Sequence, residues 1–134
     1  MKIAFVSSNY VSITKETKKG TEIFCYILVN SLVKYNKNLD ITVFASGDSS
    51  LPVKIESIDS HCSTLDKSIM QKNKHVIFEL ALLSKAFSMQ DNFDLYHVNI
   101  GDGDTALPFA PFVKKPILIT LHYTQGADYI NKYF

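Results

Sequence analysis

The amino-acid sequence predicts an α/β domain with a mostly parallel sheet, and three observations lead to that prediction. Short runs rich in apolar, β-branched and aromatic residues are bounded by turn residues, as buried strands are. Longer segments with helical spacing of their apolar residues alternate with these runs. The order of strands and helices is that of a sheet covered by helices on both faces. No linker or internal repeat divides residues 1–134, so we predict one domain.

The strands of the first half are indicated by composition. The runs Ile3–Val6 and Ile41–Ala45 are almost wholly apolar, which is typical of parallel strands buried on both faces. The run Val53–Ile58 alternates instead and predicts a short edge strand. Two further apolar runs, Leu95–Ile100 and Pro116–Leu121, predict the strands of the second half.

Helices are predicted between and after these strands. The first begins at Thr21, which can serve as its N-cap, and the second spans residues 73–90. A short third helix begins at Asp104 or Thr105, either of which can cap it, and a further helical pattern covers residues 125–134. The expected apolar stripe of the first helix consists of Phe24, Leu28, Leu32 and Tyr35.

Polar residues cluster where two predicted strands end. His97 and Asn99 lie near the end of one strand, His122 follows the next, and a Gly-Asp-Gly-Asp turn lies between the strands. A long polar loop after the first strand ends at Gly20. Ligands of open parallel sheets bind outside the carboxyl ends of the strands. We therefore expect Gly20, His97, Asn99 and His122 to surround one concave surface.

Composition argues against several classes of function. With 14 basic and 13 acidic residues the formal net charge is +1, which disfavours nucleic acid as a partner. Two cysteines are too few for a disulfide scaffold and fit a reducing cytoplasm. No apolar run is long enough to span a bilayer, although a peripheral position at the inner membrane face stays open. The first loop lacks the glycine patterns of dinucleotide-binding and phosphate-loop proteins.

Metal ions are not expected. The turn at residues 101–104 is similar to the start of a calcium loop, but the remaining ligands and the closing glutamate are missing. A zinc site of His97, Asp102 and His122 would lack the closely spaced ligand pair that anchors such sites. Structural roles are the alternatives: His122 could cap the sheet end, and His97 could pack in the core.

Taken in order, several motifs together resemble the N-terminal domain of GT-B glycosyltransferases of family four. They are MKIAFVSS, Gly20-Thr21-Glu22, ITVFASGDS, FDLYHVN, LPFAP and KPILITLHYT, and they cover nearly the whole chain. The resemblance implies a Rossmann-like N-terminal half that supplies most of the acceptor site, followed by a second domain that binds the nucleotide-sugar. The implied activity is that of a hexosyltransferase, which moves a sugar from a nucleotide-sugar to the hydroxyl of a glycan or small-molecule acceptor without a cofactor.

The resemblance also implies roles for individual residues. His122 takes the place of the histidine in a Thr-x-His-Gly-Thr motif and is expected to be catalytic, while Tyr123 replaces the glycine that follows it. Lys19 stands where the family has the first glycine of a pair. The residues expected to bind the donor or the acceptor are Gly20, Thr21, Glu22, His97, Asn99 and Tyr123.

Two other functions stay open from the sequence. The domain could be a non-catalytic module for binding or assembly, or a flavodoxin-like domain for a small ligand. The family resemblance further implies that the chain, without a second domain, is inactive by itself. In that case the cleft face would expose apolar surface, and a homodimer through that face is expected.

Overall fold

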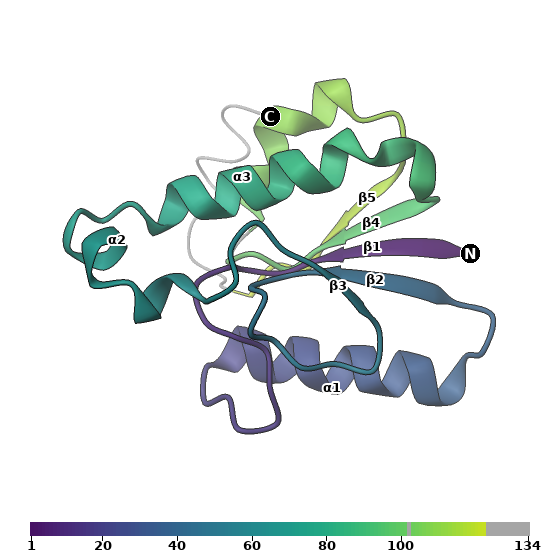
Figure 1. Ribbon diagram of the computed structural model, residues 1–134. Coiled ribbons are helices and arrows are strands. Elements are labelled where there is room, and N and C mark those ends of the chain that lie inside the picture. Colours follow the sequence, from purple (N-terminus) through teal and green to yellow (C-terminus); the bar gives the residue numbers. More distant parts are fainter. Residues whose placement is uncertain (102, 123–134) are drawn as a thin grey trace.

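The computed structural model describes residues 1–101 and 103–122, which form a five-stranded, all-parallel sheet with helices on both faces (Figure 1). The strand order is β3-β2-β1-β4-β5, as in a Rossmann-like half. The strands are β1 (Lys2–Val6), β2 (Asp40–Phe44), β3 (Lys54–Glu56), β4 (Leu95–Val98) and β5 (Ile117–Ile119). The predicted α/β class with a parallel sheet is therefore confirmed.

The two long helices lie on opposite faces of this sheet (Figure 1). Helix α1 (Gly20–Tyr35) covers one face, and α3 (His75–Ser88) covers the other together with the 3-10 helix η3 (Asp104–Phe112). The short elements are η1 (Ser63–Leu65), α2 (Lys67–Gln71) and η2 (Gln90–Asn92). Within the described part of the chain, no helix has the length and apolar character that crossing a bilayer requires.

Alternation along the strands divides the core into two clusters. Phe5 and Val43 point toward α1, where they pack with Cys25 and Val29. On the opposite face, Tyr96 is fully buried beneath α3, and its hydroxyl donates to the carbonyl oxygen of Ala86 at 2.8 Å. Both faces of the central strands are therefore dry, which explains why their sequences are almost wholly apolar.

The apolar stripe expected on α1 is partly wrong. Phe24 and Tyr35 are 39% and 77% exposed, whereas Glu22, Cys25 and Val29 form the buried face. Apolar residues surround this helix on most sides, so their spacing gives its period but not which side faces the sheet.

The expected helix caps are also corrected. Helix α1 begins one residue before Thr21, and its N-cap is Lys19, which makes no side-chain capping bond. The N-cap of η3 is Gly103 in the left-handed region at φ 75°, and Asp104 lies in the first turn, where it accepts from the N–H of Thr105. The second predicted helix is observed as α3, and the helix predicted at 125–134 lies outside the described residues.

Candidate functional site

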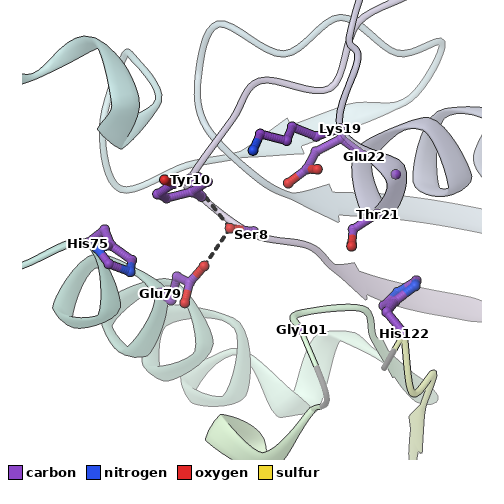
Figure 2. A pocket seen from close by; sticks show the side chains of 10 residues that line it. Ser8, Tyr10, Lys19, Thr21, Glu22, His75, Glu79, Gly101 and His122 are labelled. Atoms are coloured by element: carbon purple, nitrogen blue, oxygen red, sulfur yellow. Dashed lines mark hydrogen bonds between the residues drawn. The ribbon is translucent and has the colours of Figure 1, made fainter. Parts of the chain in front are cut away.

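A pocket of about 400 Å³ lies at the carboxyl ends of the central strands, between the N-terminal ends of α1 and α3 (Figure 2). Ser8 follows β1, Gly101 follows β4 and His122 follows β5, so three neighbouring strand ends contribute to it. Parallel strands bring these loops to one edge of the sheet, where ligands of such folds bind. The pocket is lined by Ser8, Tyr10, Lys19, Gly20, Thr21, Glu22, His75, Glu79, Gly101 and His122.

The N-terminus of α1 forms one wall of the pocket. The first intrahelical bond links the N–H of Ile23 to the carbonyl oxygen of Lys19, so the preceding N–H groups lie ahead of the helical ladder. Gly20 is exposed, and a Cβ built on it would meet no atom within 4 Å. A ligand oxygen can therefore approach the backbone here, where the helix dipole favours negative charge.

Glu22 brings a buried carboxyl into the same wall. Its residue is only 5% exposed, and burial raises the pKa of the carboxyl above its usual value. Its own backbone N–H and the charge of Lys19 oppose that rise, whereas the charge of Glu79 adds to it. Glu22 was expected near a ligand, and the structure places it in the pocket.

The facing wall comes from α3 and from the end of β1. The N–H of Tyr10 donates to Ser8 Oγ at 2.8 Å, and Ser8 Oγ donates to Glu79 Oε1 at 2.5 Å (Figure 2). This relay fixes one carboxyl oxygen of Glu79, whose pKa is raised by burial and lowered in part by the Ser8 bond. His75, one turn earlier on α3, lies edge-on to the Tyr10 ring at 5.2 Å.

His122 lines the pocket from the end of β5. Its ring packs edge-on against Phe24 of α1 with centroids 5.2 Å apart, and its backbone N–H donates to the carbonyl oxygen of Gly101 at 3.4 Å. The histidine thus connects β5, α1 and the loop after β4. Imidazole is the side chain whose ordinary pKa lies nearest to neutral pH, so histidine often serves in proton transfer.

Two of the expected residues do not line the pocket. His97 is hydrogen-bonded through Nε2 to Thr120 Oγ1 at 2.7 Å and packs on the Phe5 ring. Burial lowers the pKa of His97, as does the charge of His122, so its neutral form is favoured. Asn99 is fully buried and joins two strand ends through its N–H, which donates to the carbonyl oxygen of Val6 at 2.7 Å.

The structure therefore brings four expected residues together in the pocket, namely Gly20, Thr21, Glu22 and His122. His97 and Asn99 instead pack among the residues at the carboxyl ends of the strands. Tyr123 lies outside the described residues. Among residues 1–101 and 103–122, no three His, Cys, Asp or Glu side chains are arranged to hold a metal ion.

Sequence reasoning missed four residues of the pocket: Ser8, Tyr10, His75 and Glu79. Ser8 had a signal, because it is the second residue after a predicted buried strand. His75 and Glu79 are spaced i, i+4 on a helix, so they lie on one face, and Glu79 interrupts an otherwise apolar run. Such a carboxyl in the middle of a core-facing helix indicates a polar site nearby.

Comparison with known proteins does not add to this geometry. No protein-family model matches the sequence, and no curated protein is significantly similar to it.

Proposed function

We propose that this chain is the acceptor-side domain of a glycosyltransferase that moves a sugar from a nucleotide-sugar to an acceptor hydroxyl. One observation carries the proposal: Gly20, Thr21 and Glu22 at the start of α1 meet His122 at the end of β5 in a single pocket. These residues are about a hundred positions apart in the chain, and they belong to the motifs that resemble family-four glycosyltransferases.

Two features of the pocket support the proposal. Sugar transfer depends mainly on positioning a hydroxyl against the anomeric carbon and on stabilising the departing diphosphate. The backbone at Gly20 and Thr21 is accessible to a donor oxygen, and the imidazole of His122 can exchange a proton with the acceptor hydroxyl. In this proposal a second domain closes the pocket and binds the nucleotide.

The test is the His122→Ala variant in the product of the complete open reading frame. Loss of a proton-transferring group typically lowers turnover by about 10² to 10⁴-fold. We expect a loss in that range with an unchanged circular dichroism spectrum, measured with a panel of nucleotide-sugars and acceptors. The control is His61→Ala, because His61 is exposed and does not line the pocket. Equal turnover in both variants would remove His122 from the mechanism.

A non-catalytic assembly module is the second candidate, and one surface favours it. Ile23, Phe24 and Ile27 expose 38%, 39% and 58% of their surface on α1, and Phe24 borders the pocket through His122. Exposed apolar patches of this kind often pair with another chain. A homodimer that Ile27→Lys dissociates in sedimentation experiments, in a protein without sugar transfer, would favour this candidate over the transferase.

A further inference from the structure

We infer that the pocket binds a protonated amino group between Glu22 and Glu79, which makes its ligand an amino sugar. Glu22 reaches the pocket from α1 and Glu79 from α3, with Ser8 between them (Figure 2). The inference rests on the proposed function only where it identifies this ligand as the acceptor.

The first argument is that neither carboxyl forms an ion pair with a side chain of the described residues. Glu22 is nine-tenths buried, and its carboxyl accepts from its own backbone N–H. No side chain among residues 1–101 and 103–122 forms an ion pair with it. Glu79 accepts from Ser8 but likewise has no ion pair within the described chain. Buried carboxylates are normally paired with a cation, so a ligand cation would complete this site.

Burial raises the pKa of both carboxyls, and the nearby charges act in both directions. Lys19 lowers the pKa of Glu22, His75 lowers that of Glu79, and Asp104 raises that of Glu79. Among the described lysines, Lys19 alone lines the pocket; it is exposed, and it lies too far from either carboxyl for an ion pair. The charge of Glu79 also raises the pKa of the Glu22 carboxyl, because it acts unfavourably on the ionised form of Glu22. An ammonium group between them would relieve this repulsion, whereas an anion would add to it.

The remaining lining residues suit a hydroxyl-rich ligand. Tyr10, Thr21 and His75 present two hydroxyl groups and an imidazole, and the buried Nδ1 of His75 has no hydrogen-bond partner among the described residues. A volume of about 400 Å³ lies within the range of small-molecule sites and is ample for one sugar ring. A divalent cation is less suitable, because the described residues provide no three-ligand group.

The experiment compares three sugars of related shape on the full chain by ligand-observed NMR titration near neutral pH. Glucosamine carries the ammonium group, glucose lacks it, and N-acetylglucosamine has the same nitrogen without its charge. We expect glucosamine to bind at least about tenfold more tightly than the other two, since charge-assisted hydrogen bonds are about twice as strong as neutral ones. Similar dissociation constants for all three sugars would overturn the inference, and so would displacement of glucosamine by millimolar Mg²⁺.

Two isosteric variants locate the effect. Glu22→Gln and Glu79→Gln each remove one charge while keeping the size of the side chain, and we expect each to reduce the preference for glucosamine at least about fivefold. The matched control is Glu16→Gln, because Glu16 is exposed and does not line the pocket. An equal reduction in the control would show a general charge effect and overturn the site. Chemical shifts of the core amides verify that each variant is folded.

Failure here and failure of the proposed function can be told apart. If the protein prefers glucosamine but transfers no sugar, the amine site is supported and the transferase proposal fails. If the protein transfers sugar but binds the three sugars equally well, only the inference of an amine site fails.

Discussion

The substitution Gly20→Ala separates the stability of the fold from access to the pocket. The new methyl group would meet no atom within 4 Å, and Gly20 lies in the first turn of α1 without a positive φ. Replacing glycine by alanine at a compatible position stabilises a protein by about 0.4 to 1 kcal/mol, mainly by restricting the unfolded chain. For a domain of this size that corresponds to a rise in Tm of roughly 1 to 4 °C.

Function is expected to change in the opposite direction. The same methyl group would occupy space in front of the N–H groups of Gly20 and Thr21, where the proposed donor oxygen approaches. Loss of one preorganised hydrogen-bond donor commonly lowers kcat by about 10² to 10³-fold. We expect a comparable loss of transfer in the complete protein, measured beside a thermal melt of the same preparation.

Gly103→Ala is the contrasting control. Gly103 adopts φ 75°, and an added Cβ would overlap Ile119 Cγ2, so the variant should lose roughly 2 to 4 kcal/mol of stability. Gly103 does not line the pocket, so this loss is separate from access to it. If Gly20→Ala lowers Tm as well, the space around residue 20 is not open. If it retains full transfer, no ligand atom approaches that backbone.

Three further outcomes are expected. Burial raises the folded-state pKa of Glu22, so the ionised carboxylate lowers the stability of the fold above that pKa, and this loss disappears as pH falls toward the unfolded value near 4.5. Glu22→Gln should therefore raise the free energy of unfolding near pH 7. Urea titrations should show that this gain is lost by about pH 4.5. Tyr96→Phe removes the buried bond to Ala86 and should lower stability by about 1 kcal/mol, with an unchanged value contradicting the role of that bond. The chain by itself should not turn over nucleotide-sugars, because the proposed nucleotide site lies on a second domain. Without that site, the reaction lacks positioning of the donor worth roughly 7 to 11 kcal/mol. Donor hydrolysis by the isolated chain would place the nucleotide site on this domain.

The sheet could be predicted from the sequence because its signals are local. A strand buried on both faces must be apolar throughout, and Ile3–Val6 satisfies that condition directly. Which side of α1 faces the sheet could not be predicted, since Ile23, Phe24 and Ile27 are apolar but stay exposed. That choice is made by packing against the sheet, which periodicity does not record.

The site was predictable only in part for a related reason. Gly20 and His122 stand at the ends of recognisable elements, so their place at one sheet edge follows from topology. His97 also lies near a strand end, but alternation along β4 turns its ring onto Phe5 and toward Thr120. Glu79 lies on α3, which the sequence predicts as a helix with an apolar face. Only the tertiary structure brings its carboxyl to Ser8.

The position of Glu22 links the two halves of the proposed chemistry. Its carboxyl lies in the same helical turn as the N–H groups of Gly20 and Thr21, so a donor phosphate at those groups would face a buried negative charge. An ammonium group bound at Glu22 would neutralise that charge and favour the phosphate beside it. Because such coupling is reciprocal, glucosamine should tighten nucleotide-sugar binding to the complete protein by the same factor as the donor tightens glucosamine, at least about fivefold. Calorimetric titration of each ligand in the presence and absence of the other measures both factors, and Glu22→Gln should bring both close to one; independent binding of the two ligands would show that the phosphate lies elsewhere.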